Sequence, residues 1–144
     1  MNQKEFKKTL NNILQEYGFS REREAFYYFA DEIITVIEIQ KSNFENAFYI
    51  NYGFLIKELW PEVEFPAERE CDIRGRFQFG EINKKTYCFD YENSSAESLR
   101  KAIMEGIQKV VLPVINCGAI EYYNIFPEAK ATLTLKTKKY LNMD

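Results

Sequence analysis

The sequence contains no histidine, which removes the side chain that most often acts as a general base near neutral pH. This absence also excludes nucleophilic catalysis by a cysteine–histidine or serine–histidine pair. No two glycines lie two residues apart, as a dinucleotide-binding GxGxxG sequence requires. Gly75 and Gly80 have the spacing of a phosphate-binding P-loop, but Glu81 stands where that loop needs lysine. We therefore assign no catalytic residue and expect no nucleotide cofactor.

Long apolar runs are absent as well. The most apolar segment, Val110 to Ile115, is far shorter than the roughly 18 residues of a membrane-spanning helix. The N-terminus is polar where a signal peptide needs an apolar run. Cys71, Cys88 and Cys117 are odd in number and fit neither a disulfide framework nor a zinc site. We expect a cytoplasmic protein with reduced cysteines, no metal, no other cofactor and no membrane partner.

The composition is that of an ordinary globular protein. The 144 residues are 46% hydrophobic and 28% charged, which favours one domain spanning residues 1–144. Nineteen basic and 22 acidic residues give a net charge of −3, which disfavours a nucleic-acid partner. Aromatic residues make up 16% of the chain, a high share. The ten tyrosines among them are more than a small core buries at low cost, which favours a binding surface.

The apolar spacing predicts a helix first and strands after it. Apolar residues recur every three or four positions over residues 2–17, Asn2 and Glu5 form a capping box, and Gly18 suits the helix end. Aromatic and β-branched residues then alternate with turn signals. The predicted strands are residues 26–29, 33–40, 47–54, 71–79 and 86–91.

Helices are predicted again in the last third of the chain. Ser94 and Glu97 form a second capping-box pattern, and Pro113 predicts that this helix ends or kinks near Leu112. Further helices are predicted over residues 115–125 and 127–141, although residues 132–135 (TLTL) also alternate as a strand does. The order predicts an α+β fold with an about five-stranded, largely antiparallel sheet. The N-terminal and C-terminal helices would pack on one face of the sheet, and its polar face would meet water.

The most distinctive polar residues lie on the predicted strands. Asp72, Arg74 and Arg76 alternate with apolar residues and so share one face of the sheet. The planar guanidinium groups of neighbouring arginines can clamp an anionic group. The alternative is a solvated outer face in which the charges only form cross-strand pairs. The candidate binding residues on this face are Arg74, Arg76, Asp72, Gln40, Asn51 and Tyr49.

Several segments resemble a family of small bacterial proteins that is catalogued only as a domain of unknown function. They are Tyr17-Gly18-Phe19, residues 36–42 (VIEIQKS), 48–53 (FYINYG), 71–77 (CDIRGRF) and the Leu112-Pro113 pair, within residues 4–120. The resemblance implies a compact α+β domain in a bacterial cytosol. It supplies no activity, cofactor or catalytic residue.

Two hypotheses about function remain open. The first is a non-catalytic cytosolic binding protein that recognises another protein; in one form it is immunity-like, with an acidic surface that masks a basic partner. The second is a binder of a small anionic ligand, or an unrecognised enzyme, that uses the polar sheet face. In that case Arg74 and Arg76 would hold the anion.

Overall fold

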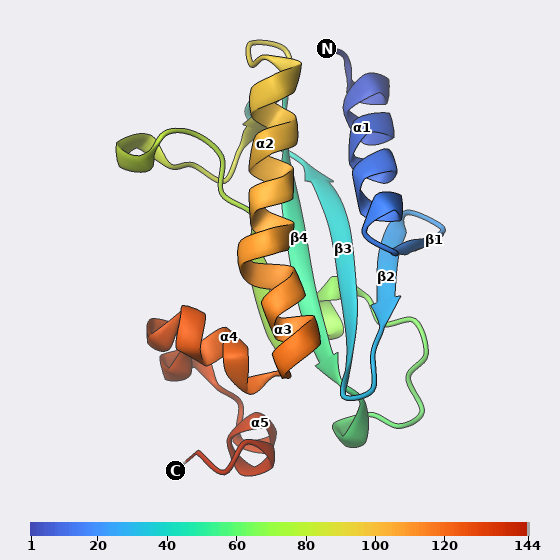
Figure 1. The fold of residues 1–144 in the computed structure, drawn as a ribbon, viewed down its shortest axis with the longest axis vertical. Helices are drawn as coiled ribbons and strands as arrows, with labels where there is room; N and C mark the ends of the chain where they lie inside the picture. Colours follow the sequence, from blue (N-terminus) through green and yellow to red (C-terminus); the bar gives the residue numbers. More distant parts are fainter. Residues whose placement is uncertain (144) are drawn as a thin grey trace.

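In the computed structural model, which describes residues 1–143, helices cover one face of a six-stranded antiparallel sheet (Figure 1). The strand order is β1-β2-β3-β4-β5, and the short β6 also pairs with β4. This confirms the α+β class and adds one strand to the predicted number. The strands are β1 (Ser20–Glu22), β2 (Ala25–Phe29), β3 (Ile33–Lys41), β4 (Ala47–Ile56), β5 (Ile73–Arg76) and β6 (Phe89–Asp90).

The first helix, α1 (Gln3–Glu16), begins and ends as its sequence predicts. The Glu5 amide donates to the Asn2 side chain, and the Asn2 amide donates back to the Glu5 carboxylate, over 2.8 and 3.1 Å. Gly18 takes a φ of +89°, which an L side chain rarely adopts, and the chain turns there into β1. The predicted apolar stripe of α1 is buried on the sheet.

The second long helix continues past Leu112, near which we predicted that it ends or kinks. It begins with α2 (Ala96–Gly106), whose cap is the Ser95 hydroxyl and not Ser94. A π-helical turn, Ile107–Val111, follows and leads directly into α3 (Leu112–Cys117).

The π turn explains why Pro113 does not end the helix. The Leu112 amide donates to the Ile107 carbonyl, five residues back, so the turn before the proline is wide. A wider turn relieves the clash between the proline ring and the preceding turn. Val111 in this turn is buried, whereas Val110 is half-buried.

The segments beyond β5 differ from the prediction in length. The predicted strand 71–79 is regular only over Ile73–Arg76, and the predicted strand 86–91 only over Phe89–Asp90. Gly80, with a φ of +113°, starts a loop that projects from the sheet edge (Figure 1). The C-terminal part is helical as predicted, but in short pieces. They are α4 (Ile120–Ile125), a 3₁₀ segment at Pro127–Thr132 and α5 (Leu135–Tyr140).

The second face of the sheet is only partly open to water, which corrects the expectation of a wholly wet face. The segment at residues 57–70 folds over the part of this face made by β2, β3 and β4. Cys71 belongs to the small core beneath this segment and not, as predicted, to the main core with Ile73. Cys71 lies before the regular part of β5, so strand alternation does not extend to it. The small core consists of Ala25, Tyr27, Ile34, Val36, Leu55 and Cys71.

Most of the tyrosines that the sequence suggested for a surface are in fact buried. Tyr27, Tyr122 and Tyr123 are each at most 6% exposed, and the Tyr27 hydroxyl donates to the Pro66 carbonyl over 2.9 Å. Tyr49 is half-buried and Tyr87 is exposed. The carbonyl acceptor offsets the cost of burying the Tyr27 hydroxyl.

The main core predicts a large effect of Ile107→Ala. Ile107 is the first residue of the π turn, and its side chain is fully buried in the main core between the helices and the sheet. Its truncation should lower the free energy of unfolding by about 2–5 kcal/mol, measured by urea denaturation. The matched control is Arg100→Ala on the exposed side of α2, which should change it by less than about 0.5 kcal/mol. Equal stabilities of the two variants would remove Ile107 from the core.

Candidate functional site

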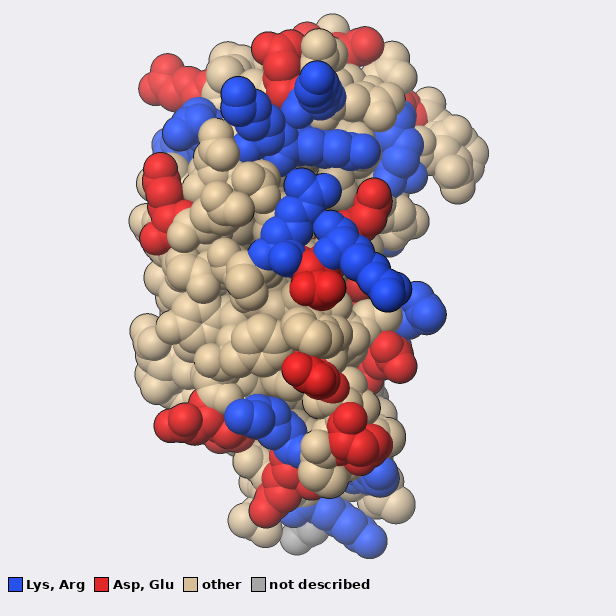
Figure 2. Space-filling model, turned by 90° about the vertical axis from the view of Figure 1, so that its right-hand side faces the viewer, with Lys and Arg blue, Asp and Glu red and all other residues tan. Residues whose placement is uncertain are grey.

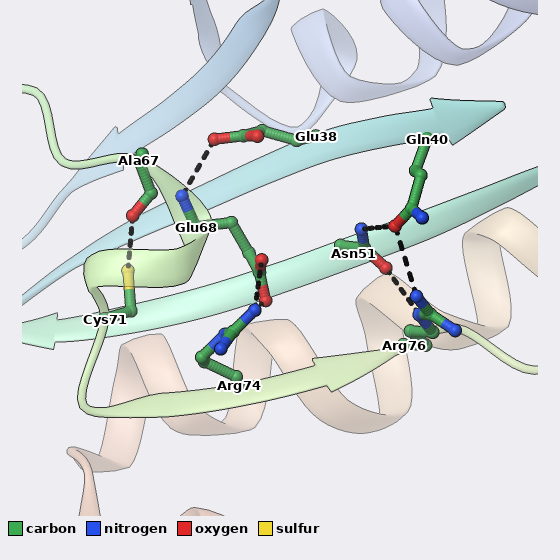
Figure 3. Close-up of polar contacts among 8 residues, drawn as sticks. All are labelled: Glu38, Gln40, Asn51, Ala67, Glu68, Cys71, Arg74 and Arg76. Atoms are coloured by element: carbon green, nitrogen blue, oxygen red, sulfur yellow. Dashed lines mark hydrogen bonds and ion pairs between the residues drawn. The ribbon is translucent and has the colours of Figure 1, made fainter.

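The uncovered part of the second sheet face brings together five of the six predicted residues. Gln40 comes from β3, Tyr49 and Asn51 from β4, and Arg74 and Arg76 from β5 (Figure 3). The antiparallel register places Asn51 directly opposite Arg76 and Tyr49 directly opposite Gln40. All of these residues except Tyr49 line, together with Glu68, an open hollow of about 310 Å³.

Arg76 is held in one position by neutral groups. Its Nε donates to Asn51 Oδ1 over 2.8 Å, and its Nη2 donates to Gln40 Oε1 over 3.1 Å. The side-chain Nδ2 of Asn51 also donates to Gln40 Oε1, and the guanidinium carbon of Arg76 lies 4.2 Å from the centre of the Tyr49 ring. Among residues 1–143 no carboxylate lies within ion-pair distance of Arg76. We call Gln40, Tyr49, Asn51 and Arg76 the arginine platform.

Arg74 has a different role, because its charge is already paired. Its Nε and Nη2 donate to the two carboxylate oxygens of Glu68 over 2.9 and 3.1 Å. The Glu68 side chain is 9% exposed and that of Arg74 is 53% exposed. These hydrogen bonds raise the pKa of Arg74. Glu38 accepts from the Glu68 amide, so both contacts fasten the 57–70 segment to the sheet (Figure 3).

Asp72 does not join the other predicted site residues. Its two carboxylate oxygens accept from the Ile56 amide over 2.7 Å and from the Trp60 indole over 2.9 Å. It therefore fixes the end of β4 and the start of the covering segment. The sequence pattern placed Asp72 beside Arg74 because we extended the strand alternation one residue too far.

Sequence reasoning missed the roles of Glu38 and Glu68. Glu68 lies in an irregular, proline-containing acidic segment, and Glu38 lies on a strand with no polar pattern of its own. The sequence contains one signal for this contact, which is that Arg74 follows Glu68 by six residues. Only the folding of that segment over the sheet makes the ion pair.

A second hollow, of about 400 Å³, lies on the helix-covered side of β5. Tyr52 and Tyr122 line it, and their hydroxyl oxygens are 3.0 Å apart. Tyr52 lies directly opposite Gly75, and a Cβ at Gly75 would come within 2.2 Å of the Tyr52 hydroxyl. Glycine at this position therefore lets the Tyr52 ring extend across β5. We call this hollow the tyrosine cleft; residues of its wall are Tyr52, Gly75, Phe77, Gly106, Tyr122 and Phe126.

The titratable groups with shifted pKa values around β5 favour their protonated forms. Burial is the main cause that raises the pKa of the Tyr52 and Tyr122 hydroxyls and of the Cys71 thiol. Burial also raises the pKa of Tyr123 to about 12. Within residues 1–143 no group of three or more Cys, Asp or Glu side chains is arranged to hold a metal ion. The arrangement offers hydrogen bonds, aromatic surface and one unpaired cation, which are means of binding.

Basic residues gather on another side of the molecule. Figure 2 shows Lys and Arg across the upper half of the side formed by α1 and β1, with acidic residues between them. The exposed basic residues of these elements and their turn are Lys4, Lys7, Lys8, Arg21 and Arg23. They lie far from the arginine platform along the sheet order.

The described helices include none that is both long and apolar enough to cross a membrane. The model of a protein family described as "Domain of unknown function (DUF4304)" matches residues 10–116. The chain belongs to this family, which confirms the resemblance seen in the sequence. The comparisons with curated proteins and with solved structures find no match.

The two arginines should differ in their effect on stability. Arg74→Ala leaves the mostly buried Glu68 carboxylate unpaired, and should lower the free energy of unfolding by about 1 kcal/mol, discounted because Arg74 is half exposed. Arg76→Ala removes contacts to exposed amides and should change it by less than about 0.5 kcal/mol. Urea denaturation of both variants measures the difference. A smaller effect for Arg74→Ala than for Arg76→Ala would contradict this assignment.

The cysteines should differ in reactivity. The raised pKa and the burial of Cys71 keep its thiolate scarce, whereas Cys117 is exposed. In the folded protein at pH 8, iodoacetamide should modify Cys117 at least about tenfold faster than Cys71, as measured by timed peptide mass spectrometry. Unfolding in urea should make the rates similar. Equal rates in the folded protein would show that Cys71 is accessible.

Proposed function

We propose that this member of the DUF4304 family is a non-catalytic binding protein that recognises another protein through the arginine platform. One observation carries the proposal: the charge of Arg76 is exposed, fixed in position and unpaired within residues 1–143. A fixed cation on an open sheet face gains most from an acidic side chain of a partner. The fork of the guanidinium suits a carboxylate.

The platform is organised before binding. Two amide oxygens and the Tyr49 ring hold the Arg76 side chain, so little rotamer entropy remains to be lost on association. Arginine and tyrosine are also enriched among the residues that dominate binding energy at protein interfaces. The Nη1 group of Arg76 makes none of these hydrogen bonds and remains available to a partner.

A small anion is less well suited to this face. Glu68 already neutralises Arg74, and the Glu38 carboxylate lies against the same segment, so one cation rather than two remains. The hollow is bordered by exposed side chains and offers a small ligand little enclosure. The available charge at Arg76 is positive, so it suits an acidic group on the partner. No contact favours the immunity-like form, in which an acidic surface masks a basic partner. Three free cysteines support a reducing, cytoplasmic setting for this binding.

The test begins with affinity capture of partners by the wild-type protein, followed by purification of the captured partner and titration calorimetry. Arg76→Ala should weaken binding by about 30-fold, the size of a dominant interface residue. Arg76→Lys should recover only part of the affinity, because an ammonium neither forms the fork nor stacks as well on Tyr49.

A charge exchange then identifies the contact. Arg76→Glu should abolish binding, and replacing the contacted carboxylate of the partner with arginine should restore it. Arg100→Ala, on the exposed side of α2, is the matched control and should bind as the wild type does. Unchanged affinity of Arg76→Ala for the captured partner, or the absence of any stoichiometric partner, would sink the proposal.

A further inference from the structure

The two hydroxyl groups in the tyrosine cleft carry two hydrogens, and the protein offers an acceptor for only one of them. Tyr52 and Tyr122 are 2% and 6% exposed, and their oxygens are 3.0 Å apart. Only one of the two hydroxyl hydrogens can lie between these oxygens. Among residues 1–143 neither hydroxyl has another hydrogen-bond partner. One O–H of a residue that lines the cleft therefore has no acceptor in the protein and is available to a ligand.

The surroundings of this donor favour an uncharged acceptor. Burial raises the pKa of both tyrosines, because the site disfavours a negative charge on either oxygen. The same desolvation penalises an anionic ligand atom placed against them. A carbonyl oxygen or a ring nitrogen accepts the hydrogen bond without that penalty.

The walls of the cleft are aromatic. Phe77 and Phe126 line it together with the two tyrosine rings. Gly106 contributes no side chain, and a Cβ there would meet the Phe77 ring at 2.8 Å. Its volume of about 400 Å³ is in the range of sites for small organic ligands. Aromatic walls around such a space suit a flat ring system.

The rim of the cleft carries charges of both signs. Lys85, Lys109 and Arg76 line it with Glu105 and Glu128, and none of these five forms an ion pair with another residue of 1–143. Three cations and two anions nearly balance, which gives no preference for a strongly charged ligand. The rim is thus compatible with a neutral or zwitterionic molecule.

We infer that the tyrosine cleft binds a small heteroaromatic molecule whose uncharged ring nitrogen or carbonyl accepts a hydrogen bond from the Tyr52–Tyr122 hydroxyl pair. This site is separate from the proposed protein-binding function. The hydroxyl pair lies on the helix-covered side of β5, and the guanidinium contacts of Arg76 lie on the opposite face. Arg76 borders both hollows, but neither tyrosine hydroxyl makes a hydrogen bond to it, so their removal leaves the hydrogen bonds of the arginine platform in place.

Quinoline and naphthalene are the probes, because they share one two-ring shape and only quinoline has a ring-nitrogen acceptor. Their dissociation constants are measured by nuclear magnetic resonance titration of the full chain. The wild type should bind quinoline about five- to tenfold more tightly than naphthalene, the value of one net hydrogen bond. Shift changes should be centred on amides of β5 and of the π turn.

The double variant Tyr52→Phe with Tyr122→Phe keeps the aromatic walls and removes both hydroxyls. It should bind naphthalene as the wild type does and lose or reverse the preference for quinoline, because quinoline still gives up its hydration. Ala102→Trp, on the helical wall, should block both probes. Arg74→Ala, on the other face, is the control and should bind both normally.

Several outcomes would overturn the inference. The first is that the wild type fails to bind quinoline at millimolar concentration. The second is that the double variant still prefers quinoline over naphthalene. Binding that persists in Ala102→Trp would place the probes elsewhere. If the double variant does not fold, the wild-type shift map and Ala102→Trp still decide the question.

Discussion

The register between β4 and β5 determines where both candidate sites lie. Asn51 lies opposite Arg76, and the next pair along the strands is Tyr52 opposite Gly75. Successive side chains of a strand point to opposite faces, so the first pair forms the arginine platform and the second forms part of the tyrosine cleft. A slip of one residue would exchange the two faces and destroy both arrangements.

The polar residues near this strand pair divide their work between structure and binding. Asp72 and the Glu68–Arg74 ion pair attach the 57–70 segment, which covers a second, smaller core. Arg76 has only neutral partners and keeps its charge available. Neighbouring arginines on one strand thus have different physical roles, decided by whether a carboxylate reaches them.

Much of the candidate site was predictable from alternation along single strands. Gln40, Tyr49, Asn51, Arg74 and Arg76 do share one face, since the period of a strand depends on no other element. The partner of Arg74 was not predictable, because Glu68 reaches it only through the path of an irregular segment. The Tyr52–Tyr122 pair joins residues 70 positions apart, and no local pattern reports such a contact.

The sequence by itself determined the helix at the N-terminus, the order of strands and helices, and the α+β class. Each of these depends on capping residues, apolar periods and turn signals within a few positions. Only the tertiary structure decided that the helix continues through Pro113, that residues 57–70 cover part of a sheet face, and that Gly75 makes room for Tyr52. These outcomes depend on packing between distant segments, where shape and unpaired polar groups outweigh local preference.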